Sequence, residues 1–144
     1  MTVAAILKHK GYDVASVRPG ISIAEVAHLL AGRRIGAVVV QDGTGHLLGI
    51  LSERDIVAAI AAHGARTLDM AAEDLMTRSV QTATLRTSVE EAMHIMTAGR
   101  FRHLPVLNHG VLTGIVSIGD IVKARMSQQD HEVDSLKAYV AGVG

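Results

Sequence analysis

Two stretches of the chain place an aspartate three residues after a serine. They are residues 49–55, GILSERD, and residues 114–120, GIVSIGD. In each, an apolar run crosses a glycine and ends on the serine, and two β-branched residues follow the aspartate. This pattern predicts a strand that turns directly into a helix. The carboxylate oxygens of Asp55 and Asp120, facing outward from such turns, would form an acceptor pair suited to a vicinal diol.

A purely structural role for these pairs has to be weighed first, because a serine followed three residues later by an acid is also a helix capping box. Ser22 with Glu25 and Ser88 with Glu91 begin two other predicted helices in the same way. Aspartate is one methylene shorter than glutamate and so less suited to reaching back to the cap. The comparison favours a role beyond capping for the two aspartates, with capping alone as the alternative.

Other catalytic and metal-binding patterns are lacking in the sequence. It contains no cysteine, its eight histidines include no i, i+4 pair, and it has neither a Gly-rich phosphate loop nor a dinucleotide-binding fingerprint. No histidine lies at a spacing that would activate Ser52 as a nucleophile. We therefore expect neither a catalytic residue nor a metal site.

The composition argues against several classes of partner. Lys plus Arg and Asp plus Glu number 14 each, and the aromatic residues are two tyrosines and one phenylalanine, so nucleic acid is a poor candidate. The apolar runs are far shorter than the roughly 20 residues that cross a bilayer. The N-terminus has no signal-peptide pattern. The sequence predicts a soluble, cytoplasmic protein.

Helical and strand periodicities alternate along the first half of the chain. The expected elements are a short helix capped by Thr2, a strand at 14–17, a helix from Ser22 to Gly32, strands at 35–40 and 46–51, and a helix over about 53–63. The turn between the last two strands predicts a hairpin.

The second half of the chain repeats this unit. Ser22 aligns with Ser88 without a gap, and Asp55 aligns with Asp120 once a single deletion is placed in the turn at 108–110. The predicted fold class is α/β, with two strand-helix-strand-strand-helix repeats, each containing a small mixed sheet. A pseudo-twofold axis would relate the two.

Three parts are expected along the chain. Residues 1–66 hold a short N-terminal helix and repeat one, residues 67–128 a linker helix and repeat two, and residues 129–144 a C-terminal helix. Val133, Leu136, Tyr139 and Val140 fall on one side of this last helix, which predicts packing either on the repeats or on a second chain.

The repeat resembles the cystathionine β-synthase (CBS) domain, and the pair resembles a stand-alone Bateman module of the short bacterial CBS-pair type. The resemblance extends over residues 14–123. It rests on the two serine-aspartate stretches, on residues 102–106, RHLPV, and on residues 74–77, DLMT. Each motif alone is weak, whereas together they are specific.

The resemblance implies an adenosine cleft in each repeat, between the first strand and the hairpin. It implies that Asp55 and Asp120 hold ribose hydroxyls and that Ser52 and Ser117 lie beside the ribose or phosphate. The adenine-contacting positions that it implies are Ala15, Ile35 and Ala37 in repeat one and Gln81, Phe101 and His103 in repeat two.

The resemblance also implies that the phosphates of one site reach a basic residue of the other repeat. Arg100 matches this position for site one and Arg34 for site two, with Arg54 and Arg102 as further candidates. A guanidinium fork suits phosphate, although arginines after a helix end also serve as solvated charges.

The two clefts differ in sequence. Repeat two has Ile118 and Gly119 in place of the charged pair at 53–54, and it has His103 where repeat one has Ala37. We therefore expect the two clefts to differ in affinity.

The function expected from the sequence is that of a non-catalytic regulatory module that senses adenine nucleotides. AMP is the first candidate ligand, and ADP, ATP, NAD and S-adenosyl compounds are the alternatives. The resemblance implies a homodimer through packing of CBS domains, with an unidentified regulated protein as a further partner. A different interpretation is a protein-interaction module with vestigial clefts. A third, an enzyme acting on nucleotides, would need a metal or base that the sequence lacks.

Overall fold

The computed structural model describes residues 1–143, and its elements follow the predicted order. The first part of the chain forms α1 (Val3–Lys10), β1 (Ser16–Val17), α2 (Ile23–Arg33), β2 (Ala37–Gln41), β3 (Leu47–Ser52) and α3 (Glu53–His63). A 3-10 helix, η1 (Gly64–Asp69), and the short helix α4 (Ala72–Leu75) lead into the second part. That part forms β4 (Ala83–Thr84), α5 (Val89–Gly99), β5 (His103–Asn108), β6 (Val111–Ser117) and α6 (Ile118–Val143).

Each repeat contains one mixed three-stranded sheet, with the strand orders β1-β2-β3 and β4-β5-β6. The first two strands of each sheet are parallel, and the last two form an antiparallel hairpin. Val40 faces Gly49 in the first hairpin, and Val106 faces Gly114 in the second. The single deletion between the repeats therefore lies in the hairpin turn. The predicted α/β fold with two repeats is confirmed.

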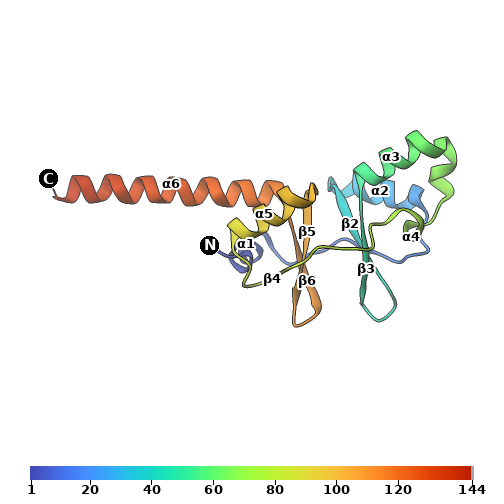
Figure 1. Ribbon diagram of the computed structural model, residues 1–144, viewed down its shortest axis with the longest axis horizontal. Helices are drawn as coiled ribbons and strands as arrows, with labels where there is room; N and C mark the ends of the chain where they lie inside the picture. The colour runs from blue at the N-terminus through green and yellow to red at the C-terminus, as the bar shows by residue number, and fades with distance from the viewer. Residues whose placement is uncertain (144) are drawn as a thin grey trace.

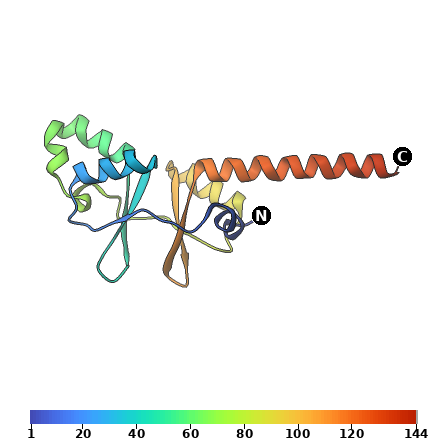
Figure 2. The ribbon, with the colours of Figure 1, turned by 180° about the vertical axis from the view of Figure 1, so that it is seen from behind.

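The short helix that precedes each repeat packs on the other repeat. Val3, Ile6 and Leu7 of α1 are buried in the hydrophobic core of repeat two, whereas Ala72 and Met76, in and just after α4, are buried in the core of repeat one. Figures 1 and 2 show α1 beside the second repeat and α4 beside the first, with the two hairpins side by side between them. Packing thus crosses the predicted boundary between 66 and 67, because each core is completed by a helix from elsewhere in the chain.

A glycine in each hairpin permits this close packing. A Cβ atom on Gly49 would lie 2.6 Å from the Met76 Sδ and 2.8 Å from the Thr77 carbonyl oxygen. A Cβ atom on Gly114 would lie 2.8 Å from both terminal carbons of Leu7. The glycines of the two serine-aspartate stretches therefore let the exchanged segments approach the sheets.

Some local expectations differ from the structure. The Thr2 side chain makes no capping hydrogen bond, and β1 is shorter than the predicted strand at 14–17. Helix α2 continues through Gly32 to Arg33 and ends because Arg34 adopts the left-handed conformation, at φ 54° and ψ 45°. The predicted turn from strand into helix is confirmed, since α3 begins directly after Ser52.

The C-terminal tail continues the last helix of repeat two. Helix α6 is 26 residues long and runs without a break from Ile118 to Val143, whereas the sequence suggested a separate helix from residue 129. Its first turns pack against α5 and α1, and the remainder projects from the body of the molecule (Figure 1). None of the helices within residues 1–143 has the length and apolar character needed to cross a membrane.

Candidate functional site

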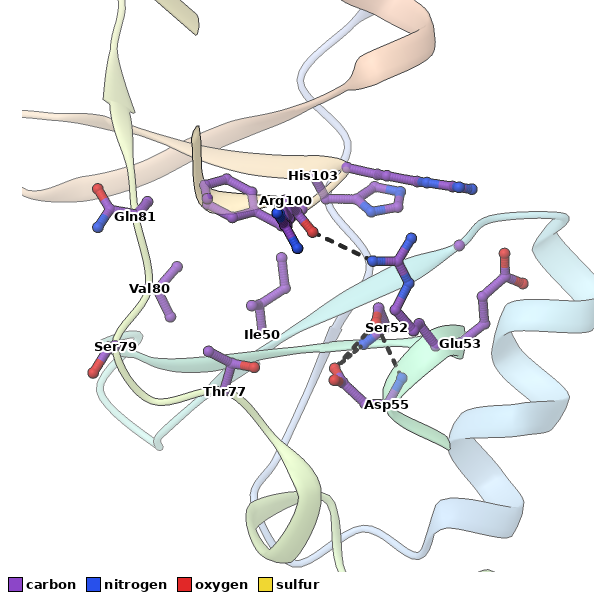
Figure 3. A pocket seen from close by; sticks show the side chains of 15 residues that line it. Ile50, Ser52, Glu53, Asp55, Thr77, Ser79, Val80, Gln81, Arg100 and His103 are labelled. Atoms are coloured by element: carbon purple, nitrogen blue, oxygen red, sulfur yellow. Dashed lines mark hydrogen bonds between the residues drawn. The ribbon is translucent and has the colours of Figure 1, made fainter. Parts of the chain in front are cut away.

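A cleft of about 290 Å³ lies between the two repeats (Figure 3). Its first wall is the end of β3 and the first turn of α3, and its second wall is the segment that enters repeat two together with the turn between α5 and β5. Eight residues singled out in the sequence line this cleft, namely Ser52, Arg54, Asp55, Gln81, Arg100, Phe101, Arg102 and His103. The cleft thus combines residues from both repeats.

Asp55 is fixed by a complete capping box with Ser52. The Ser52 amide donates to Asp55 Oδ2 at 2.9 Å, the Ser52 hydroxyl donates to the same oxygen at 3.1 Å, and the Asp55 amide donates to Ser52 Oγ at 3.3 Å. These bonds hold the carboxylate at the start of α3. Both of the bonds that the carboxylate accepts from Ser52 use Oδ2, which leaves Oδ1 as an acceptor for a ligand hydroxyl.

The argument from side-chain length was wrong. Asp55 and Asp120 both reach back to the cap, and Asp120 Oδ2 accepts from the Ser117 amide at 2.8 Å. At Glu25 and Glu91, the capping bond is the one from the glutamate amide to the serine hydroxyl. Ser52 has an extended backbone, at φ −105° and ψ 162°, as Ser22 and Ser88 also do, and the Asp55 side chain is long enough to reach its amide. Capping alone therefore accounts for an aspartate in both turns, and the case for a site rests on what surrounds it.

Three arginines lie on the cleft that contains Asp55. Arg54 comes from α3, while Arg100 and Arg102 come from the turn before β5. The Arg54 Nη1 donates to the Arg100 carbonyl at 3.3 Å, which links the two walls (Figure 3). Three guanidinium groups outnumber the carboxylates Glu53 and Asp55 along this cleft, so it is suited to a phosphate-bearing anion.

Arg100 adopts a backbone conformation that only glycine adopts freely. Its φ is 57° and its ψ is 40°, and the matching residue of repeat one, Arg34, has almost the same angles. A non-glycine residue in this region costs of order 1 kcal/mol or more. Each arginine ends a helix by adopting this conformation, and the shape of the turn fixes where its side chain begins.

The cleft is also lined by Phe101, Gln81 and His103. Phe101 packs against the core of repeat two, and Gln81 brings an amide to the same cleft. Burial lowers the pKa of His103, and the positive charge of Lys10 lowers it further against the opposing effect of Glu53 and Asp120. The imidazole is therefore neutral at pH 7, with one nitrogen to donate and one to accept. A ring, a neutral imidazole and an amide together suit a heteroaromatic base.

The adenine positions implied for repeat one do not line this cleft. Ala15 and Ile35 pack against the core of repeat one, and Ala37 is 6% exposed and pairs with Ser52 in the sheet. Arg34 and Ile35 line a shallower groove between α2 and α3. The structure therefore brings Asp55 together with Gln81, Phe101 and His103, and not with the first strand of its own repeat. The cause is that the segment leading into each repeat packs on the other repeat.

Asp120 of repeat two is already paired within the chain. The Lys10 Nζ lies 2.6 Å from Asp120 Oδ2 and also donates to the Ile115 carbonyl at 2.9 Å. Burial raises the pKa of the Asp120 carboxyl, but hydrogen bonds from Lys10 and Ser117 outweigh burial and lower it. The side chain of Asp120 is 24% exposed. Lys10 aligns with Met76 in the sequence alignment of the repeats, so the position that holds an ammonium before one repeat holds a thioether before the other.

Several cleft residues were not identified from the sequence. Thr77, Ser79 and Val80 line the cleft. Thr77 is fixed to β3 because its amide donates to the Ile50 carbonyl at 2.9 Å and its carbonyl accepts from the Ile50 amide at 3.1 Å. Gly36 is also part of the cleft, and a Cβ there would lie 3.1 Å from the His103 ring. The alignment of the repeats could have drawn attention to Lys10, because it matches Lys10 with Met76.

The part of the chain that the structure describes contains no group of three or more His, Asp or Glu residues placed to hold a metal ion.

Known proteins resemble this chain in sequence and in structure. The CBS domain model matches residues 3–62 and 72–127. The crystal structure of a CBS-domain containing protein from Agrobacterium tumefaciens is 47% identical, covers 87% of this chain and 99% of its own, and has a TM-score of 0.85. The CBS domain-containing protein YhcV of Bacillus subtilis is 32% identical over 81% of this chain and 82% of its own.

Two similar structures contain adenosine compounds. The CBS domain pair of protein MJ0100 was solved in complex with 5-methylthioadenosine and S-adenosyl-L-methionine; it is 27% identical, covers 89% of this chain and 98% of its own, and has a TM-score of 0.79. CBSX2 was solved in complex with AMP; it is 28% identical, covers 81% of this chain and 90% of its own, and has a TM-score of 0.69.

Proposed function

The chain belongs to the CBS domain family, and on this premise we propose that it is a non-catalytic sensor that binds an adenine nucleotide, AMP first, in the cleft between its two repeats. The observation that carries the proposal is the presence of Asp55 and three arginines on one cleft whose walls come from both repeats. The volume of about 290 Å³ lies near the lower end of the range for small-molecule sites.

Each part of a nucleotide has a matching group in the cleft. The Asp55 carboxylate, held by Ser52, accepts hydrogen bonds from the ribose hydroxyls. Phe101, His103 and Gln81 contact the base, and Arg100 with its neighbours Arg54 and Arg102 binds the phosphate. A carboxylate for the ribose and guanidinium groups for the phosphate are the usual complements of these groups.

The arginines favour a phosphorylated ligand over the other adenosine compounds. The relatives MJ0100 and CBSX2 were solved with 5-methylthioadenosine and S-adenosyl-L-methionine and with AMP, respectively, and all three ligands contain adenosine. Only AMP among them carries a phosphate. A sulfonium cation beside three guanidinium groups would be repelled, so S-adenosyl-L-methionine is disfavoured in this cleft. ADP, ATP and NAD remain the alternatives to AMP.

We further propose that one cleft of the pair binds nucleotide. In repeat two, the ammonium of Lys10 binds Asp120 Oδ2 and neutralises the carboxylate, which makes its other oxygen a weaker acceptor for a ribose hydroxyl than that of Asp55. Repeat two also has Ile118 and Gly119 where repeat one has Glu53 and Arg54, so it offers fewer polar contacts. The expected stoichiometry is one nucleotide per chain.

Regulation would follow from the fact that the walls of the cleft come from both repeats. A ligand that contacts both repeats stabilises the arrangement in which their walls are correctly spaced, and a partner protein that prefers this arrangement would bind more tightly in its presence. The protein would then report nucleotide concentration without changing the nucleotide.

Thermal melts and isothermal titration against AMP, ADP, ATP, NAD, S-adenosyl-L-methionine and adenosine test the proposal. A ligand that binds only the folded state raises the melting temperature with concentration, and AMP is expected to do so more than adenosine because adenosine lacks the phosphate. If no compound of the panel raises the melting temperature or releases heat, the sensor proposal fails and the interaction module with vestigial clefts is favoured. Formation of a product from any nucleotide would overturn the non-catalytic assignment.

A further inference from the structure

The part of α6 beyond the body of the molecule lacks a packing partner among residues 1–143. Its side chains from Gln129 to Gly142 are all exposed, and the helix extends straight away from both repeats (Figures 1 and 2). Isolated helices shorter than about 12–15 residues are marginal in water, and most helices in proteins are stabilised by packing an apolar face. We therefore expect the exposed part of α6 to pack against a partner.

Apolar side chains recur along α6 at alternating spacings of four and three residues. The positions are Val122, Met126, Val133, Leu136 and Val140, with Gln129 at the one remaining place in the series. We call these six residues the α6 seam. The apolar members are between 47% and 63% exposed, which is unusual for a continuous stripe of large aliphatic side chains.

The spacing is that of a coiled-coil heptad. Met126, Val133 and Val140 take the a positions, whereas Val122, Gln129 and Leu136 take the d positions. A β-branched residue at a with leucine at d favours two parallel strands, and Val133 followed by Leu136 has this arrangement. Gln129 provides one polar layer, which lowers stability and helps to fix the register.

The body of the molecule does not cover the seam. Ile118 and Arg125 of α6 contact repeat two, and the residues of α6 that are buried there are Ile121 and Ala124, which are 0% and 8% exposed. These two buried residues take the c and f positions of the same heptad, away from the a and d side. A second helix can therefore lie along the seam without displacing either repeat.

We propose that α6 forms a parallel two-stranded coiled coil with α6 of a second copy of this chain. In a parallel pair, each g residue faces the e residue of the next heptad on the other helix. Arg125 would face Asp130 of the second copy, and Glu132 would face Lys137 of the second copy. Both contacts join opposite charges, and the twofold symmetry of the dimer doubles each of them.

In an antiparallel pair, fewer of the contacts between charged residues are attractive. The alignment that sets Val133 against Leu136 pairs Asp130 with Lys137 but leaves Glu132 against Tyr139. The neighbouring alignment brings Asp130 against Asp130 and Lys123 against Lys137, which are repulsive. The parallel arrangement is the one in which every e and g contact within residues 125–137 is attractive.

Charge variants of the full chain test the interface by analytical ultracentrifugation. Arg125 already contacts Glu90 of its own chain at 2.8 Å, so the Glu132 and Lys137 contact is the cleaner one to alter. Glu132→Lys and Lys137→Glu are each expected to raise the dimer dissociation constant on the order of tenfold, because each replaces two attractive contacts by repulsive ones. Mixing the two variants is expected to restore the dimer, since every contact in the mixed pair is attractive. Asp134→Lys, at an outward b position, is the matched control and is expected to leave the dissociation constant unchanged.

A single engineered cysteine tests the orientation. The chain has no cysteine, so Val140→Cys introduces the only thiol. In a parallel pair the two Cys side chains share one a layer and are expected to form a disulfide on mild oxidation, whereas the antiparallel alignment separates them by roughly 16 Å along the axis. Ala138→Cys, at an outward f position, is the control that is expected to stay monomeric on a non-reducing gel.

A wild-type chain that stays monomeric at every concentration would overturn the proposal, as would a dimer that neither charge variant weakens. All the substituted residues are exposed, so the variants are expected to fold, which circular dichroism checks. The proposal is independent of nucleotide binding, and the same variants are expected to bind AMP as the wild type does.

Discussion

The ammonium of Lys10 lies 2.6 Å from Asp120 Oδ2, whereas the residue that aligns with Lys10 in sequence is Met76, which is buried in the core of repeat one. The two aspartates have equivalent capping boxes, so the repeats themselves do not account for the difference. The difference comes from the exchanged helices, because α1 ends in a charged residue where the α4 segment has an apolar one. Asp120 is neutralised from within the chain, and Asp55 faces a cleft with an excess of arginine.

Replacing Lys10 by methionine is expected to raise the pKa of Asp120. Burial, which raises this pKa, is opposed by hydrogen bonds from Lys10 and Ser117, and the variant removes the first of them. Because the folded pKa lies below the unfolded value of about 3.9, the stabilisation is complete above that value and is lost as the pH falls through the folded pKa. We expect Lys10→Met to be less stable than the wild type by up to about 1 kcal/mol at neutral pH, with the difference vanishing in acid. A carboxyl titration followed by NMR measures the pKa directly, and an unchanged value would contradict the prediction. Lys8→Met, an exposed lysine on the same helix, is the control.

The same substitution is expected to open the second cleft. Without the ammonium, the Asp120 carboxylate keeps its full charge and becomes a stronger acceptor for a ribose, with Arg34 as the matching phosphate ligand from the other repeat. Isothermal titration of Lys10→Met with AMP should give a second binding event that is weaker than the first, because Ile118 and Gly119 replace a charged pair. A stoichiometry that stays at one nucleotide per chain would show that Lys10 is not what closes this cleft. If the wild type bound two nucleotides per chain, the proposed difference between the two clefts would be contradicted.

Matched substitutions of the two aspartates separate capping from binding. Asp55→Ala and Asp120→Ala each remove an equivalent capping box and are expected to cost about 1 kcal/mol of stability for that reason. Asp55→Ala alone is expected to abolish AMP binding to the cleft between the repeats. Isothermal titration at a temperature where both variants are folded measures this difference. Equal affinity of the wild type and Asp55→Ala would remove the ribose role of Asp55.

The two arginines at helix ends allow a similar comparison. Arg100→Gly and Arg34→Gly each relieve a left-handed conformation, and each is expected to raise the free energy of unfolding by up to about 1 kcal/mol, less the extra flexibility of glycine in the unfolded chain. Arg100→Gly also removes a guanidinium from the cleft and is expected to weaken AMP binding while leaving adenosine binding nearly unchanged. Arg34→Gly is expected to bind AMP as the wild type does. Denaturant titrations and isothermal titration together check the prediction, and an equal loss of AMP affinity in both variants would contradict it.

Much of the fold could be predicted because its signals are local or recur in both repeats. The turn from strand into helix at Ser52 follows from an apolar run, a cap and a helical period, and the matching sheet registers follow from the alignment of the two repeats. The exchange of α1 and α4 was not predicted. Val3 and Leu7 form an apolar face that would satisfy either repeat, so periodicity does not specify which core buries them.

The site was only partly predictable for the same reason. Residues such as Asp55 and Arg100 were identified individually, but their grouping depends on which segment crosses which sheet. The ion pair of Lys10 with Asp120 joins residues far apart in the sequence, and no local pattern marks it. Only the mismatch between Lys10 and Met76 in the alignment of the repeats gives a trace of it in the sequence.

The glycines that admit the exchanged segments should respond unequally to alanine. A Cβ on Gly49 would lie 2.8 Å from the Thr77 carbonyl oxygen, which is backbone and is fixed to β3 by two hydrogen bonds to Ile50. The atoms nearest to a Cβ on Gly114 would all belong to the Leu7 side chain, which can turn away at the cost of some packing.

Gly49→Ala is therefore expected to destabilise the protein by about 1–3 kcal/mol, as overpacking does, and Gly114→Ala by less. Because Thr77 lies on the cleft, Gly49→Ala should also weaken AMP binding, whereas Gly114→Ala should not. Urea unfolding and isothermal titration of the two variants measure both effects. If Gly114→Ala proved the more damaging of the two, the backbone of Thr77 would not be the constraint that requires glycine at position 49.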